Sequence, residues 1–328
     1  MIDPITARWV IWGYKNTYHT HNHIHEALFR ALKFMGRDVV WVDTGDPLME
    51  FGDFRGCIFL TEHQKMLTLP RHKESFYFVH NIEDSEVEFF TGLPTINWGG
   101  KVRINTLPEF RCTENIASPQ MTCGDLIWDY ALGWRGLPLF RNLWATDLLP
   151  HEIEEIAKGF PHPWNPQSKV INWIGTVNND HNLEVPKFIQ ACKENGIEFR
   201  GIGGFTPGQG KNHPTIQENA ALIRASYMAP AIGNTRQAAV GYVPCRVFKN
   251  ISYGMYPPTN LEAANELFDY RLICNRDPYE LFYEARADLP QTPQRLLQNL
   301  MRTVAQEHTY VNRVNEISNA IRIYQEAR

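Results

Sequence analysis

Short apolar runs alternate with amphipathic segments along this chain, and the alternation starts twice. In the first half the apolar runs cover Trp9–Tyr14, Val39–Val42, Cys57–Leu60 and Phe76–Val79. Between the first two, the spacing of Ile24, Leu28 and Leu32 predicts a helix over His23–Gly36. Short buried strands separated by amphipathic helices are typical of a parallel sheet covered by helices. The first half is therefore expected to form a Rossmann-like α/β domain.

The pattern restarts after a proline-rich stretch, FPHPWNPQ, at residues 160–167. Because 328 residues suit two domains, we expect an N-terminal domain over 1–155 and a C-terminal domain over 156–328. Whether the last helix returns to the first domain stays open. The second half is expected to contain strands and helices in the following order: strand Val170–Ile174, helix Leu183–Asn195, strand Ile197–Ile202, helix Thr215–Ala225 with a Thr215/Glu218 capping box, strand Met228–Ile232, helix Cys245–Tyr253 and a long amphipathic segment Pro293–Ala327.

Charge and cysteine content narrow the functional classes. The formal net charge is -4, which favours neither nucleic acid nor an anionic membrane as a partner. The six cysteines form no C-x-x-C pair and are expected to be reduced thiols. No apolar run approaches the roughly 18 residues that span a membrane, and the N-terminus lacks the pattern of a signal peptide. We therefore expect a cytoplasmic protein without a transmembrane segment.

Polar side chains follow three strands of the first half, where ligands bind in parallel sheets. The segment Tyr18–Glu26 is expected to be a histidine-rich loop, in which His23 and His25 are candidate bases. Glu62 and His80 follow the third and fourth apolar runs and are further candidates. His21 and His23 also form an H-x-H pair, which could chelate zinc. Because no further ligands with suitable spacing follow in the sequence, a zinc site at this pair is disfavoured.

The second half contains the most specific pattern, GYVPCRVFKNISYG at 241–254. Pro244 favours the start of a helix, and free amides at a helix N-terminus bind phosphate. Arg246, Lys249 and Asn250 would share one face of that helix, with Tyr242 just before it. An arginine and a lysine suit a diphosphate, because one offers a fork of N–H donors and the other a point charge.

Residues after other strands of the second half are expected to line the same site: Gly175, Thr176, Gly203, Thr259, Asn260 and Glu262. No G-x-G-x-x-G opens a helix after a strand, and no P-loop or G-x-S-x-G elbow occurs. Classical dinucleotide binding, P-loop chemistry and α/β-hydrolase chemistry are therefore disfavoured.

Four segments of the chain resemble GT-B glycosyltransferases of the group that contains CgeB-like and related viral or bacterial polysaccharide-type enzymes. These segments are HNHIHEALFRALKFMGRDVVWVD, LWATDLLPHEI, GYVPCRVFKNISYGMYPPTN with LEAANELF, and EHTYVNRVNEI. The resemblance implies two Rossmann-like domains facing across a cleft. It also implies a donor domain in which Arg246 and Lys249 contact the diphosphate of a UDP- or GDP-linked sugar.

The same resemblance implies that the first domain binds a glycan acceptor near His23 and His25, and that no metal is obligatory, since no D-x-D motif appears. One departure concerns Lys249, which stands where many such enzymes have a glutamate. Glu262 is the candidate substitute, so inversion and retention both stay open. Three rival functions also stay open: a metal-dependent hydrolase using the histidine-rich loop, a sugar-nucleotide epimerase, and a non-catalytic nucleotide-sugar binder.

Overall fold

The structure is a computed structural model of the 328-residue chain. It describes residues 1–16, 20–83, 85–98, 101–103, 110–112, 124, 126–127, 137–159, 161–175, 177, 183–203, 214–239 and 241–327.

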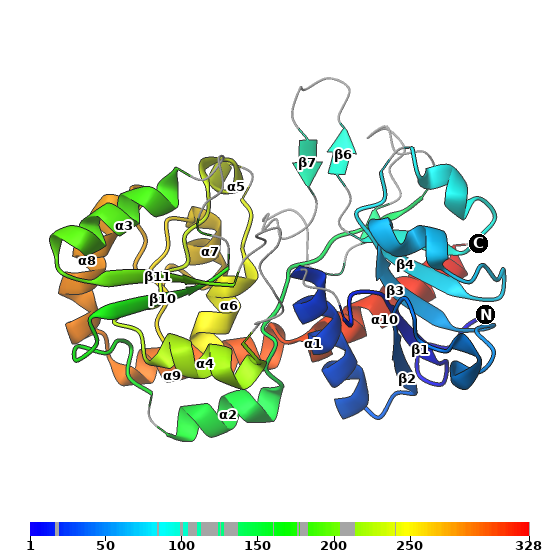
Figure 1. Ribbon diagram of the computed structural model, residues 1–328, viewed down its shortest axis with the longest axis horizontal. Coiled ribbons are helices and arrows are strands. Elements are labelled where there is room, and N and C mark those ends of the chain that lie inside the picture. The colour runs from blue at the N-terminus through cyan, green and yellow to red at the C-terminus, as the bar shows by residue number, and fades with distance from the viewer. Residues whose placement is uncertain are drawn as a thin grey trace. The chain divides into compact units, whose positions relative to one another are not determined.

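The chain forms two compact units, each described separately below (Figure 1). Unit 1 consists of Met1–Asn115, Pro119–Leu143 and Tyr310–Arg328, and unit 2 of Ile116–Ser118 and Trp144–Thr309. The chain thus passes into unit 2 after Leu143, whereas the sequence led us to expect a domain boundary after residue 155. The helix that follows this point packs against a later helix of unit 2, α2 (Pro150–Lys158) against α9 (Gln294–Glu307).

Unit 1 is built around parallel strands. Its elements are β1 (Trp9–Trp12), α1 (Thr20–Phe34), β2 (Val39–Val42), η1 (Leu48–Phe51), β3 (Ile58–Glu62), η2 (His63–Thr68), β4 (Phe76–His80), η3 (Val87–Phe90), β5 (Thr95–Trp98), β6 (Lys101–Arg103), β7 (Phe110–Cys112), β8 (Leu126–Ile127), β9 (Leu139–Phe140) and α10 (Tyr310–Glu326). Within the described residues the main sheet has the order β2-β1-β3-β4-β5-β9-β8. Every neighbouring pair is parallel except β8 and β9, and β6 and β7 form a separate antiparallel pair.

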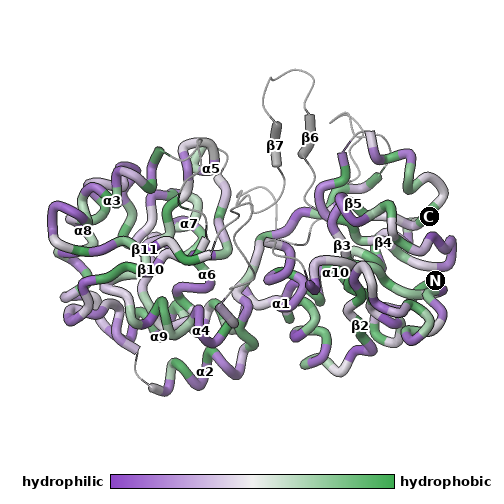
Figure 2. Tube along the Cα trace, viewed as in Figure 1, coloured by the Kyte–Doolittle hydropathy of each residue, from purple (hydrophilic) through white to green (hydrophobic). Residues whose placement is uncertain are grey.

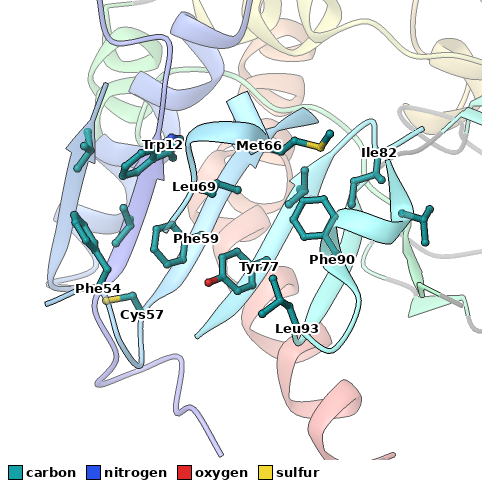
Figure 3. Close-up of a cluster of buried hydrophobic side chains, with 14 residues drawn as sticks. Trp12, Phe54, Cys57, Phe59, Met66, Leu69, Tyr77, Ile82, Phe90 and Leu93 are labelled. Carbon is teal, nitrogen blue, oxygen red and sulfur yellow. The ribbon is translucent and has the colours of Figure 1, made fainter. Parts of the chain in front are cut away.

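Strands β1, β3 and β4 of this sheet are buried along their whole length, as expected for central parallel strands. Figure 3 shows one face, where Trp12, Phe59, Tyr77 and Phe90 pack in a single apolar cluster. On the other face, the ring of Phe76 meets the ring of Tyr324 on α10 at 5.0 Å. The last helix of the chain therefore completes the core of unit 1, where the red α10 lies among blue and cyan elements (Figure 1).

Unit 2 contains a smaller sheet and more helices. Its elements are α2, β10 (Val170–Ile174), α3 (Glu184–Glu194), β11 (Glu198–Ile202), α4 (Ile216–Arg224), α5 (Thr235–Ala239), α6 (Cys245–Ser252), α7 (Glu262–Leu267), α8 (Pro278–Asp288), η5 (Leu289–Gln291) and α9. Strands β10 and β11 are parallel. In Figure 2, hydrophilic residues are frequent on helices of this unit such as α3 and α8.

Single parallel bridges extend the pattern of β10 and β11. Ala231 pairs with Thr259, and Thr259 pairs with Cys274. The expected strand Met228–Ile232 is reduced to the bridge at Ala231, because Pro230 has no N–H and cannot continue a ladder. Unit 2 is thus an α/β unit in which β10 and β11 are parallel and further parallel contacts are single bridges.

Most other sequence expectations for the elements hold within one or two residues. Thr215 caps α4, and Glu218 completes the capping box. Helix α6 begins at Cys245 with Pro244 as its N-cap. The helix expected from His23 begins three residues earlier, at Thr20, so His21 as well as His23 and His25 lies on α1 and not in a loop. Tyr18 and His19 lie outside the described residues.

Candidate functional site

The carboxyl ends of β1, β3 and β4 carry a buried polar cluster in unit 1. Strand register places Glu62 beside His80, at the ends of β3 and β4. Tyr14 follows β1, and its hydroxyl donates to Glu62 Oε2 at 2.5 Å. The side chains of Tyr14, Glu62 and His80 are each at most 3% exposed. Adjacent parallel strands therefore bring together two of the residues that the sequence singled out.

Glu62 is the centre of a chain of ionic hydrogen bonds. His63 Nε2 lies 3.0 Å from Glu62 Oε1, and His63 Nδ1 lies 2.9 Å from Glu86 Oε1. Burial tends to raise the pKa of Glu62, but hydrogen bonds from His63 and Tyr14 outweigh burial and hold that pKa below its ordinary value. The hydrogen bond to Glu62 raises the pKa of His63 to about 9, against burial and with support from Glu86. At neutral pH, His63 is therefore a cation between two carboxylates, and Glu62 already accepts from Tyr14, from His63 and from the backbone N–H of Gln64.

Two histidines form a second, separate pair in the same cluster. His21 Nε2 lies 2.7 Å from His80 Nδ1, and the two rings are 7% and 3% exposed. One imidazole must donate and the other accept, because a neutral ring has one N–H and one lone pair. This pair joins the first turn of α1 to the end of β4.

The ring of His25 is held by a hydrogen bond to the backbone. Its Nδ1 lies 2.9 Å from Gly13 O, which also accepts from Trp41 Nε1. A carbonyl oxygen only accepts, so His25 Nδ1 carries the proton. His23 is partly buried on α1.

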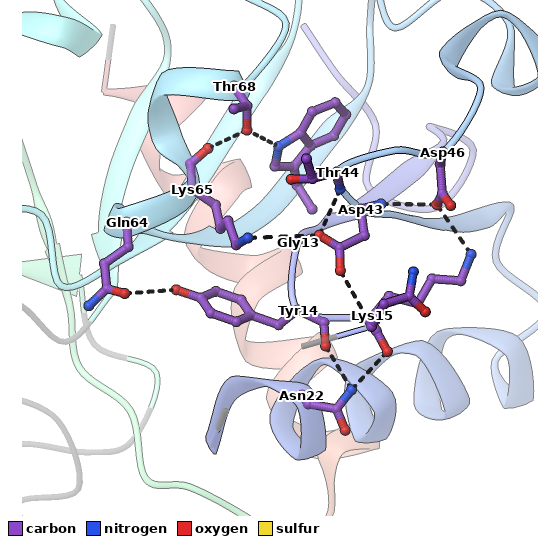
Figure 4. A network of polar contacts seen from close by, with 12 residues as sticks. Gly13, Tyr14, Lys15, Asn22, Asp43, Thr44, Asp46, Gln64, Lys65 and Thr68 are labelled. Carbon is purple, nitrogen blue, oxygen red and sulfur yellow. Dashed lines mark hydrogen bonds and ion pairs between the residues drawn. The ribbon is translucent and has the colours of Figure 1, made fainter. Parts of the chain in front are cut away.

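The turn after β1 is held in an unusual conformation. Gly13 and Tyr14 both have positive φ, of 89° and 62°, which is rare for a tyrosine. The side-chain amide of Asn22 donates to the carbonyl of Tyr14 at 2.7 Å, as Figure 4 shows. Lys65 lies over the Tyr14 ring at 5.1 Å and would collide with a Cβ at Gly13. Non-glycine residues with positive φ cluster at functional sites, and Asn81, just after β4, is another with φ 61°.

In unit 2, Arg246 lies at the carboxyl end of β10. Its guanidinium stacks on Trp173 at 3.6 Å from the ring centroid, and Nη2 donates to Ile174 O at 2.8 Å. A Cβ built at Gly175 would lie 2.9 Å from the same Nη2. Burial lowers the pKa of Arg246 to about 10, so the side chain stays charged at neutral pH. Glycine at 175 and the arginine at the start of α6 thus meet where a parallel sheet binds its ligands.

Lys249 has a partner inside unit 2. Its Nζ lies 2.7 Å from Asp147 Oδ2, and that carboxylate is 1% exposed. Tyr253 also donates to Asp147, at 2.7 and 2.9 Å. Burial tends to lower the pKa of Lys249, but Asp147 outweighs it and raises that pKa. The lysine therefore anchors Asp147 to α6.

Several other expected site residues have structural contacts. The Asn250 amide donates to Ala229 O at 2.8 Å, and the Thr259 hydroxyl donates to Ala231 O at 2.8 Å. The side chain of Asn260 exchanges hydrogen bonds with the backbone of Gly233. All three are at most 3% exposed, so their polar groups hold adjoining segments together.

The remaining expected residues are placed as follows. Gly175 and Gly203 end β10 and β11 with positive φ, Pro244 caps α6, Tyr242 is partly buried, and Glu262 is exposed in the first turn of α7. Thr176 lies outside the described residues.

Tyr14, Trp173 and Asp147 were not predicted as members of these clusters, and His21 was considered as one of the histidines of its segment and as a metal ligand. A tyrosine directly after Gly13 at a strand end was the available signal for Tyr14. Nothing in residue spacing indicated that Asp147, about a hundred positions before Lys249, would pair with it.

Comparison with known proteins adds no assignment. No protein-family model matches the chain, and no curated protein matches it either. Among the residues described here, no helix is long and apolar enough to cross a membrane. Over the same residues, no group of three or more histidine, cysteine, aspartate or glutamate side chains is arranged to hold a metal ion.

Proposed function

We propose that the protein is a glycosyltransferase that moves a sugar from a nucleoside-diphosphate sugar to a hydroxyl of a glycan or related acceptor. In this proposal unit 2 binds the donor, unit 1 binds the acceptor, and the two adopt the GT-B arrangement. The donor nucleotide is UDP or GDP.

The observation that carries the proposal is the position of Arg246. A guanidinium at the carboxyl end of a parallel strand, next to a glycine with φ 127°, suits an approaching diphosphate. Its stack on Trp173 holds the fork of N–H donors in one orientation. When the glycosidic bond breaks, negative charge grows on the leaving diphosphate, and a fixed cation there lowers the barrier.

The contacts of Lys249 refine this picture. Since its ammonium already pairs with Asp147, we assign the diphosphate contact to Arg246. Lys249 then supports the site by fixing α6, which carries Arg246 at its second residue.

Unit 1 supports the second half of the proposal. An acceptor hydroxyl must lose a proton as it attacks, and histidine exchanges protons near neutral pH. The buried histidines and Glu62 lie at the carboxyl edge of the sheet in unit 1, where polar groups that handle a proton are expected.

A thermal-shift screen with UDP and GDP tests the donor site. A ligand at about 100 times its dissociation constant stabilises the folded state by about 2.7 kcal/mol, or roughly 5–10 °C for a domain of this size. We expect one of the two nucleotides to raise the melting temperature and Arg246→Ala to abolish the rise. Arg200→Ala is the matched control, because Arg200 lies on β11 of the same unit and pairs with exposed Glu198. An equal shift in Arg246→Ala and the parent protein would contradict the assignment.

A further inference from the structure

We propose that unit 1 binds an anionic sugar at Lys65, so that the acceptor of the proposed transfer carries a carboxylate or a phosphate. The inference rests on the proposed function, in which unit 1 binds the acceptor, and it adds the charge of that substrate. The binding site itself lies within unit 1.

Lys65 lies where three neighbouring strands of the sheet end. It belongs to η2, which follows β3, and its side chain extends past Gly13, after β1, toward Asp43, after β2 (Figure 4). Strands β2, β1 and β3 are adjacent in the sheet, and parallel sheets bind their ligands beyond the carboxyl ends of their strands. The side chain is 22% exposed, so its ammonium is held at this edge of the sheet and not extended into solvent.

Packing holds the lysine in this position. A Cβ built at Gly13 would lie 2.7 Å from Lys65 Cγ, so the stem of the lysine lies directly against the backbone of the turn after β1. The ammonium lies 5.1 Å from the centre of the Tyr14 ring. Ordering a long lysine side chain costs conformational entropy, and this packing offsets part of that cost before a ligand binds.

The ammonium of Lys65 lacks a close acceptor. Its Nζ lies 3.9 Å from Asp43 Oδ1, which is beyond hydrogen-bond distance. The neighbouring Lys15, by comparison, has its Nζ 3.2 Å from Asp46 Oδ2. In the part of the chain that the structure describes, no acceptor lies within hydrogen-bond distance of the Lys65 ammonium.

The carboxylate of Asp43 is held by other donors. Its oxygens accept from the backbone N–H groups of Asn16 and Thr44, at 2.9 and 2.7 Å. Hydrogen bonds to a charged oxygen are strong, so these two fix the carboxylate in its place. Lys65 therefore keeps its hydrogen-bond donors for another acceptor.

The chemistry of an ammonium indicates what that acceptor is. An ammonium has three N–H donors and no lone pair, so it binds only acceptors. Among the groups that sugars carry, carboxylate and phosphate oxygens form the strongest hydrogen bonds with it, because both partners are charged. A lysine is a point charge, and it does not distinguish a planar carboxylate from a tetrahedral phosphate. The site therefore selects the charge of the ligand.

Isothermal titration calorimetry with glucuronic acid, glucose 6-phosphate and glucose tests the site in the absence of nucleotide. The titrations use Arg246→Ala as the parent, so that an anion held by unit 2 does not contribute. We expect at least one charged sugar to bind about tenfold or more tightly than glucose, and the added Lys65→Met to lower its affinity by a similar factor. The charged sugar that binds more tightly distinguishes carboxylate from phosphate.

Two further variants separate charge from packing. Lys65→Arg keeps a cation and should keep the binding that Lys65→Met loses. Lys73→Met, at an exposed lysine of the same unit, should leave binding unchanged. Added sodium chloride should weaken binding of the charged sugar to the parent, because salt screens the attraction between charges, and this measurement needs no lysine variant.

Four results would overturn the inference. These are charged sugars that bind no better than glucose, an affinity that Lys65→Met leaves unchanged, a loss that is equal in Lys65→Met and Lys65→Arg, and binding that does not respond to salt. The proposed function fails by a different result, namely that neither UDP nor GDP raises the melting temperature of the natural sequence. A persistent nucleotide shift without binding of charged sugars would refute only the anion site.

Discussion

The buried ion pair between Lys249 and Asp147 gives the sharpest stability prediction. Replacing Lys249 with methionine keeps the stem of the side chain and removes the ammonium. The Asp147 carboxylate, 1% exposed, would then keep its hydrogen bonds from Tyr253 but lose the opposite charge of the ammonium. Removing one partner of a buried pair costs about 3–5 kcal/mol. We expect about 3 kcal/mol for Lys249→Met, because the lysine is 20% exposed and Tyr253 still contacts both carboxylate oxygens.

Urea denaturation monitored by tryptophan fluorescence measures this loss in the free energy of unfolding, and thermal denaturation measures the matching change in melting temperature. At roughly 2–4 °C per kcal/mol, the melting temperature of unit 2 should fall by about 6–12 °C. Lys187→Met is the matched control: Lys187 pairs with Glu184 at 3.2 Å but is 48% exposed, so its loss should cost about 1 kcal/mol or less. The double variant Lys249→Met with Asp147→Leu should recover most of the stability, since it removes both charges of the buried pair.

Equal costs for Lys249→Met and Lys187→Met would refute this reasoning. The same variant also separates the two roles considered for the lysine. If Lys249 anchors Asp147, the nucleotide should still raise the melting temperature of Lys249→Met, from its lower starting value. If Lys249→Met is folded but UDP and GDP no longer raise its melting temperature, Lys249 would instead be assigned a contact with the diphosphate.

Three further predictions concern other sites. The pKa of His63 rises from 6.5 to about 9 on folding. Its contribution to the free energy of unfolding is therefore complete below pH 6.5 and falls by up to about 3 kcal/mol as the pH rises to 9. The urea midpoint of the parent protein should therefore fall between pH 6.5 and 9, and this fall should be smaller in His63→Gln. Gly175→Ala places a Cβ at φ 127° and 2.9 Å from Arg246 Nη2, so the variant should melt earlier and weaken the nucleotide shift, whereas an unchanged shift argues against contact at this edge. Thr215→Ala removes the cap of α4 and should cost about 1 kcal/mol in chemical denaturation, with no effect on nucleotide binding.

The sequence predicted the helices and strands better than it predicted which side chains contact one another. Strands β2 and β10 lie where periodicity placed them, because short apolar runs between turn residues have few other solutions. The bridge at Ala231 was overestimated as a strand, since the effect of Pro230 on the ladder was not weighed. The start of α1 was missed by three residues, because histidines alternating with polar residues hide a helical pattern.

The candidate sites were predictable only in part. Proximity to strand ends was enough to select Glu62 and His80, because the fold class fixes where such ends lie. Arg246 was selected for its place at a helix start. Pairings such as Lys249 with Asp147 depend on three-dimensional packing across about a hundred residues, and no local pattern records them. Whether a polar residue faces a ligand or a neighbour was therefore beyond the sequence, as Asn250 illustrates.

The return of α10 to unit 1 has a consequence for biosynthesis. On the ribosome, nearly all of unit 2 emerges as one uninterrupted stretch, Trp144–Thr309, and can acquire its core while synthesis continues. Unit 1 must wait for Tyr324, which packs on Phe76, to leave the exit tunnel. The sheet therefore lacks this part of its cover until α10 (Tyr310–Glu326) has emerged, and a chain without that helix would expose the ring of Phe76 to chaperones and proteases.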